Sequence, residues 1–154
     1  MMRLVGSDGS LFEISVVDYE YPEIQFEEYD SNWLLIRMHV VHPRGEWTSV
    51  DPSLLTYEVE ALANRFDAIA KGDHVDVVQR FTEPNLSLRL LDQHLESRLL
   101  AVYFNLENPV PWARHTVALA EDLFVEFPLS EVDLARAAEE LRHELAQYPQ
   151  RAAR

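Results

Sequence analysis

The amino-acid sequence predicts an α+β fold: a mainly antiparallel curved sheet of about seven or eight strands with two amphipathic helices, at about residues 52–71 and 131–148. Two observations lead to this prediction. Most apolar residues lie in short segments separated by connections of a few residues, which suits antiparallel strands because parallel strands need long crossovers. Two longer segments instead place apolar residues three and four positions apart, which is the period of a helix.

Two hairpins are expected at the start of the chain. In the first, residues 2–5 pair with the alternating segment 11–17 across the turn sequence at residues 7–10. In the second, residues 33–41 are rich in β-branched and aromatic side chains, and residues 46–50 return beside them. The first half of the sheet should therefore be a meander.

The first helix is predicted at residues 52–71. Asp51 is expected to be its N-cap and Pro52 its first residue, where the missing N–H of proline has no effect. Gly72 is expected to end it as a C-cap. Its apolar side chains recur at helical spacing, at Leu55, Val59, Leu62, Phe66 and Ile69.

Strands are expected again at residues 75–81, 86–91 and 98–106, joined by short connections, and a long extended segment at 116–127. The second helix then begins at Ser130, which forms a capping box with Asp133, and Pro149 stops it. We expect one domain over residues 1–149 and a frayed tail at 150–154.

The composition is that of a folded, strongly acidic chain. The 154 residues are 47% hydrophobic, and 27 acidic residues against 13 basic ones give a formal charge of −14. Such a charge argues against nucleic acid as a ligand and favours a basic protein partner, or serves solubility alone. The sequence has no cysteine and no apolar N-terminal or membrane-spanning segment, so a cytoplasmic protein without a membrane partner is expected.

Residues 18–30 combine acidic and aromatic side chains, and eight acidic residues lie among the first thirty, against Arg3 alone. Acidic side chains can attract a basic partner, and exposed aromatic side chains among them can then anchor it. The alternative is a strand and loop whose aromatic rings pack on the core. The candidate partner-binding residues are Asp18, Glu20, Tyr21, Glu23, Phe26, Glu27, Glu28, Tyr29 and Asp30.

No pattern of residues indicates catalysis, a cofactor or a metal. The six histidines are scattered, no two of them at helical i, i+4 spacing, and the chain lacks cysteine, a Gly-x-Ser-x-Gly motif and a glycine-rich phosphate loop. We therefore expect no cofactor, no metal and no catalytic residues. An acid/base hydrolase, or a metal held by carboxylates alone, stays open because any two of the acidic residues could meet in a cleft.

A series of short motifs along the chain resembles the WapI family of bacterial immunity proteins. The motif Phe81-Thr82-Glu83-Pro84-Asn85-Leu86 is its most specific part, with Trp33 and Trp47 upstream and Val102-Tyr103-Phe104-Asn105 and Pro111-Trp112 downstream. Tyr57 stands where tryptophan is more usual, which preserves an aromatic side chain. The resulting family-motif residues are Trp33, Trp47, Phe81, Thr82, Glu83, Pro84 and Asn85.

The resemblance implies a bacterial cytoplasmic antidote that is not an enzyme. Such a protein binds and neutralises the toxic C-terminal domain of a polymorphic or contact-delivered toxin, and these domains are often nucleases with basic surfaces. The partner would then be the cognate toxin domain, and no homo-oligomer is predicted. The alternative is a non-catalytic accessory or small-ligand-binding domain with a pocket beneath the loop at residues 109–112.

Overall fold

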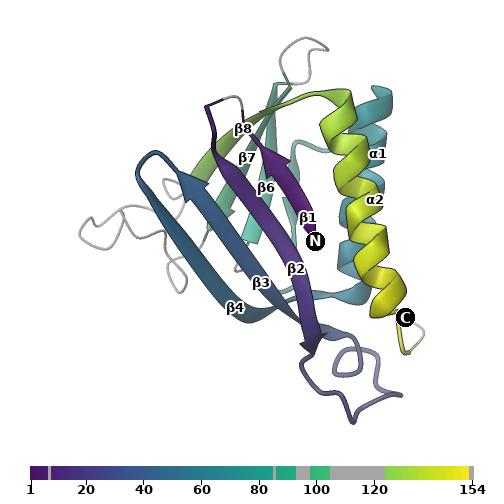
Figure 1. Cartoon of the computed structure of the whole chain (residues 1–154). Helices are drawn as coiled ribbons and strands as arrows, with labels where there is room; N and C mark the ends of the chain where they lie inside the picture. Colours follow the sequence, from purple (N-terminus) through teal and green to yellow (C-terminus); the bar gives the residue numbers. More distant parts are fainter. Residues whose placement is uncertain (7, 85, 93–97, 105–123, 153–154) are drawn as a thin grey trace.

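The protein is built from two antiparallel sheets and two helices (Figure 1). The structure, a computed structural model, describes residues 1–6, 8–84, 86–92, 98–104 and 124–152. In this part of the chain the first sheet holds β1 (Met2–Val5), β2 (Leu11–Tyr19), β3 (Trp33–His42) and β4 (Gly45–Leu55), followed by α1 (Thr56–Lys71). The second sheet holds β5 (Val78–Arg80), β6 (Leu86–Asp92), β7 (Arg98–Phe104) and β8 (Phe124–Leu129), followed by α2 (Glu131–Gln147).

Each sheet is a meander whose strands are neighbours in sequence order. The predicted α+β class, the antiparallel pairing and the two helices are therefore confirmed. The strands form two sheets of four where the sequence suggested one curved sheet. Figure 1 shows β1 to β4 in front, the second sheet behind them, and the helices side by side.

One hydrophobic core joins both sheets and both helices. Along β3 every second side chain is fully buried, as expected for a strand with one face inside: Leu34, Ile36, Met38 and Val40. Phe12 of β2 and Phe127 of β8 lie with ring centroids 6.2 Å apart, so the inner faces of the two sheets meet. Phe66 of α1 and Leu141 of α2 complete the core from the helical side.

The start of the first helix differs from the prediction. Asp51 and Pro52 are not its N-terminus but lie inside β4, and the helix begins at Thr56. Leu54 and Leu55 are fully buried and pair with β3, so extending the strand buries two large side chains. Pro52 is tolerated there because β4 is at the edge of its sheet, where a missing N–H is acceptable.

The other predicted boundaries fare better. The first hairpin pairs the expected segments, with Val5 opposite Leu11. Gly72 ends α1 in the left-handed conformation, at φ 81°, and the side chains of Ser130 and Asp133 form the predicted capping box of α2. The strand expected at 75–81 shortens to β5. Of the extended segment at 116–127 only its last residues are described, in β8, and the loop at 109–112 lies outside the described residues.

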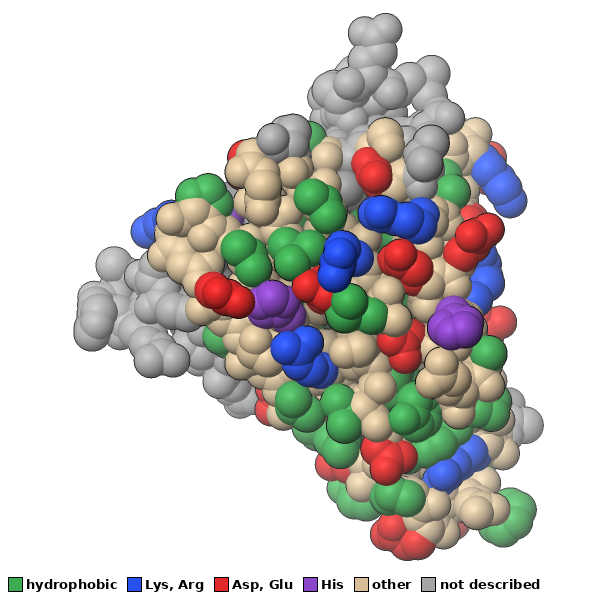
Figure 2. All heavy atoms as spheres, in the orientation of Figure 1, with side chains coloured by type: hydrophobic (Ala, Val, Ile, Leu, Met, Phe, Trp, Pro, Cys, Tyr) green, Lys and Arg blue, Asp and Glu red, His purple; other side chains and the backbone are tan. Residues whose placement is uncertain are grey.

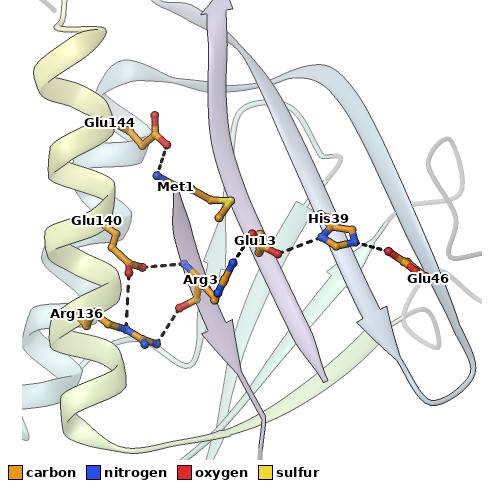
Figure 3. A network of polar contacts seen from close by, with 8 residues as sticks. All are labelled: Met1, Arg3, Glu13, His39, Glu46, Arg136, Glu140 and Glu144. Carbon is orange, nitrogen blue, oxygen red and sulfur yellow. Dashed lines mark hydrogen bonds and ion pairs between the residues drawn. The ribbon is translucent and has the colours of Figure 1, made fainter. Parts of the chain in front are cut away.

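Helix α2 covers the open edge of β1 (Figure 3). The Arg3 N–H donates to Glu140 Oε2 at 2.8 Å, and the Arg136 guanidinium donates to the Arg3 carbonyl at 3.2 Å. Side chains of the helix thus take the place of a neighbouring strand. This arrangement blocks the addition of another chain at this edge.

A row of charged side chains crosses the outer face of the first sheet (Figure 3). The strand register places Arg3 opposite Glu13 and Glu13 opposite His39. His39 lies between two carboxylates, with Nδ1 3.1 Å from Glu13 and Nε2 2.8 Å from Glu46. The hydrogen bond to Glu46, with a further one to Glu13, raises the pKa of His39 above its usual 6.5, against the opposing effect of burial.

Because the pKa of His39 is raised in the folded protein, protonated His39 stabilises the fold. This contribution is complete below the unfolded pKa of 6.5 and is lost as the pH rises through the folded-state pKa. We expect urea unfolding measured from about pH 5 to about pH 9 to show this loss of stability, and His39→Gln to remove it. His74→Gln, at an exposed histidine, should show the same dependence of unfolding free energy on pH as wild type. If His39→Gln also shows the wild-type pH dependence, the assignment to His39 is wrong.

Candidate functional site

The segment between β2 and β3, residues 20–32, is called here the acidic loop because it carries five acidic residues and no basic one. Its ends are held together by the Glu20 N–H, which donates to the Trp33 carbonyl at 2.9 Å. Within it, the N–H groups of Ile24 and Asn32 donate to the carbonyls of Tyr21 and Tyr29. The loop is therefore folded on itself by backbone hydrogen bonds.

An irregularity at the end of β2 determines which side chains face outward where the acidic loop begins. The pairing of β2 with β3 shifts register between Val16 and Asp18, which has the effect of a β-bulge. Before the shift, Ile14 and Val16 face the core. After it, Asp18 is exposed and Tyr19 is buried, so an acidic side chain is turned outward where simple alternation would have buried it.

The predicted partner-binding residues lie together on this surface. Exposed acidic residues are Asp18, Glu23, Glu27, Glu28 and Asp30, and Glu20 is half-buried. The aromatic side chains are exposed as well, by 90% for Phe26, 52% for Tyr29 and 37% for Tyr21. Figure 2 shows acidic and apolar side chains close together at the lower end of the molecule, where this loop lies.

These carboxylates give the loop a negative electrostatic potential. Among the described residues, no ion pair involves any acidic side chain between Asp18 and Asp30. The charge of Glu20, together with its hydrogen bond and the charges of Asp30 and Glu23, raises the pKa of Tyr21 above 10.0. A cation approaching this surface would therefore be attracted.

Asn32 ties the acidic loop to the core and is fully buried. Its Oδ1 accepts hydrogen bonds from Thr56 Oγ1 at 2.9 Å and from the Arg151 N–H at 3.0 Å. Its Nδ2 donates to the Glu28 carbonyl at 2.8 Å. One side chain thus connects the loop to the start of α1 and to the C-terminal segment, a role that sequence analysis did not find.

Asn32→Ala should lower the free energy of unfolding by roughly 2 to 4 kcal/mol, because buried partners lose their hydrogen bonds. Urea unfolding measures this directly. The matched control is Asn64→Ala, at an exposed asparagine on α1 that loses one solvent-exposed hydrogen bond from Arg142, with an expected change below about 1 kcal/mol. Equal stability of the two variants would mean that Asn32 does not hold the loop.

The family-motif residues are divided between aromatic side chains that pack in or beside the core and a more exposed turn that precedes β6. Trp47 and Phe81 are buried and Trp33 is half-buried, in line with aromatic packing. Thr82 and Pro84 are exposed, Glu83 is half-buried, and Asn85 lies outside the described residues.

Glu58 links this motif to the first helix. Its carboxylate accepts from the Leu55 N–H at 3.0 Å and from the Thr82 N–H at 2.6 Å. The first bond caps α1, and the second attaches the turn at residues 81–84 to the helix end. Here the motif acts as a structural turn.

Glu58→Ala should lower the free energy of unfolding by about 1 to 2 kcal/mol, since both N–H groups lose their acceptor. Thermal and urea unfolding are suitable measurements. Glu60→Ala removes an exposed carboxylate from the same helix and should change stability by less than about 0.5 kcal/mol. If Glu58→Ala is as stable as Glu60→Ala, the capping role is wrong.

Two further properties bear on the kind of site. Within the described residues, no three histidine, aspartate or glutamate side chains are grouped so that they could hold a metal ion. In the same part of the chain, no helix is both long and apolar enough to cross a membrane.

Comparison with known proteins identifies a family. Residues 3–149 of the 154 match the family described as immunity protein WapI-like. Neither the curated proteins nor the solved structures yielded a match. The matched region contains both sheets, both helices and the acidic loop, and we conclude that this chain belongs to the immunity protein WapI-like family.

Proposed function

We propose that this protein is a bacterial cytoplasmic immunity protein that binds and neutralises the toxic C-terminal domain of a polymorphic toxin. Membership in the immunity protein WapI-like family supports the general role. The binding surface in this proposal consists of Asp18 and the acidic loop. The protein acts by occupying the toxin and not by catalysis.

One observation carries the choice of surface. Phe26, a large apolar ring that is 90% exposed, lies in the same loop as five acidic side chains that have no ion-pair partner in the described part of the chain. A partner that covered this ring would remove a large apolar surface from water. The combination suits a basic surface that contains an apolar contact point.

The charge also suggests how neutralisation could work. A toxin domain that cleaves nucleic acid must bind phosphates, so its active-site cleft is rich in lysine and arginine. The acidic loop can occupy such a cleft in place of the phosphate backbone. Long-range attraction would speed the encounter, and burial of Phe26 with Tyr21 or Tyr29 would slow dissociation.

A pull-down of partners from the native lysate tests this function at about 50 mM and about 300 mM salt, since charge attraction weakens as ionic strength rises. We expect a basic toxin domain to be captured at low salt and largely released at high salt. Its toxicity when expressed alone then confirms the partner. If the folded protein captures no toxin domain at either salt, the accessory or small-ligand alternative becomes the better account.

A further inference from the structure

The guanidinium of Arg151 lies inside the acidic loop. Its Nη1 donates to the carbonyl oxygens of Tyr21 at 3.3 Å, Pro22 at 2.8 Å and Ile24 at 2.9 Å. The same guanidinium stacks on the Tyr19 ring, with Cζ 3.4 Å from the ring centroid. The sequence suggested a frayed tail from residue 150 onward, yet here Arg151 contacts the loop along much of its first half.

The chain around Arg151 is itself fixed to the body of the protein. The Tyr19 hydroxyl donates to the Pro149 carbonyl at 2.6 Å, and the Tyr148 hydroxyl donates to the Val17 carbonyl at 2.9 Å. The rings of Tyr19 and Tyr148 meet edge to face, with centroids 5.6 Å apart. Because Tyr148 directly follows α2, Arg151 is attached through this cluster to the helix and the core.

The Arg151 guanidinium contacts backbone carbonyls and a ring, and not the carboxylates of this acidic segment. Its hydrogen bonds go to backbone carbonyls and its face to an aromatic ring, so none of the surrounding carboxylates is neutralised by a direct ion pair. A loop with five like charges would expand if nothing held its backbone. Arg151 therefore adds to the order that Asn32 and the backbone hydrogen bonds give the loop, while leaving the acidic side chains available.

We propose that Arg151 is a positioning residue that holds the acidic loop in one conformation and so presents Phe26 and its acidic neighbours ready for binding. The binding part rests on the proposed function, whereas the ordering of the loop does not. The partner surface that fits is an apolar pocket ringed by arginine and lysine. A preformed loop avoids the loss of conformational entropy that binding would otherwise require.

Hydrogen exchange of the isolated protein tests the ordering of the loop. In Arg151→Ala, the hydrogen-bonded amides of the loop, among them those of Ile24, Ser31 and Asn32, should exchange about tenfold faster or more, while amides of β3 and α1 keep their wild-type rates. Arg151→Lys keeps a cation that can donate to carbonyls, and it should restore protection in part. Lys71→Ala removes the same charge at the far end of α1 from Thr56 and should leave the loop unchanged. Wild-type exchange in Arg151→Ala would overturn the proposal.

Affinity for the basic toxin domain from the pull-down tests the binding part. Arg151→Ala makes the net charge one unit more negative than −14, so attraction alone predicts equal or tighter binding. Positioning predicts the opposite: if the ordered loop falls to about a tenth of molecules, Kd rises about tenfold. Faster loop exchange with unchanged or tighter binding would overturn the presentation role and place the toxin on another surface. Faster exchange with weaker binding, partly restored by Arg151→Lys, supports both proposals.

Discussion

Replacing Glu23, Glu27 and Glu28 with lysine is expected to slow association with the toxin domain by roughly ten- to a thousandfold at low salt. All three side chains are exposed, so the substitutions should not disturb the core. The formal charge of the loop changes from negative to positive, so the loop repels a basic surface that the wild-type loop attracts. Stopped-flow association measured across a series of salt concentrations should also show a flatter salt dependence than wild type.

The matched control reverses three exposed acidic residues elsewhere: Glu60, Asp73 and Glu139. It changes the net charge by the same amount but leaves the acidic loop intact. A small decrease in the association rate is expected, because distant charges are screened at moderate ionic strength. If both triple variants slow association equally, net charge and not the acidic loop governs the encounter.

Phe26→Ala is expected to weaken binding of the toxin domain by about 2 to 4 kcal/mol, which corresponds to roughly a thirtyfold to thousandfold rise in Kd. The ring is 90% exposed in the free protein, so a partner that covers it removes most of the ring's apolar surface from water, which favours binding. For the same reason the free energy of unfolding should stay within about 0.5 kcal/mol of wild type. Calorimetric titration and urea unfolding together check both statements.

Val50→Ala provides the comparison for this substitution. Val50 is 51% exposed on β4, outside the acidic loop, so its truncation should leave Kd nearly unchanged. The effect of Phe26→Ala should appear mainly in the dissociation rate, in contrast to the charge reversals. A Phe26→Ala variant that binds as tightly as wild type would exclude Phe26 as an anchor.

Much of the fold could be predicted because local patterns and tertiary packing agree. In β1 and β3 the alternation of buried and exposed side chains is visible in the sequence, and Gly72 and Ser130 carry ordinary cap chemistry. The start of α1 was missed because Asp51 and Pro52 are a good helix start locally. The core overrode that signal by burying Leu54 and Leu55 in a strand.

The candidate site was predictable in composition but not in construction. The acidic candidates and Tyr21, Phe26 and Tyr29 were visible in the sequence, and the structure places Asp18 at the end of β2 and the others in the loop that follows. Nothing in the sequence indicates that Asn32 and Arg151 meet, since their hydrogen bond joins segments 119 residues apart. The pairing of Glu13 with His39 could not be derived either, because the loop at residues 20–32 leaves the register between β2 and β3 open in the sequence.

Neutralisation of a toxin through the acidic loop has a direct consequence for cell growth. The measurement is the growth of cells that express the recovered toxin domain. One culture also expresses the wild-type protein, and the other expresses a variant that carries Phe26→Ala and lysine at positions 23, 27 and 28. If the acidic loop binds the toxin, wild-type protein restores growth, and the variant, folded and present at the same level, does not. Equal protection by the two proteins would contradict it and move the binding surface elsewhere on the molecule.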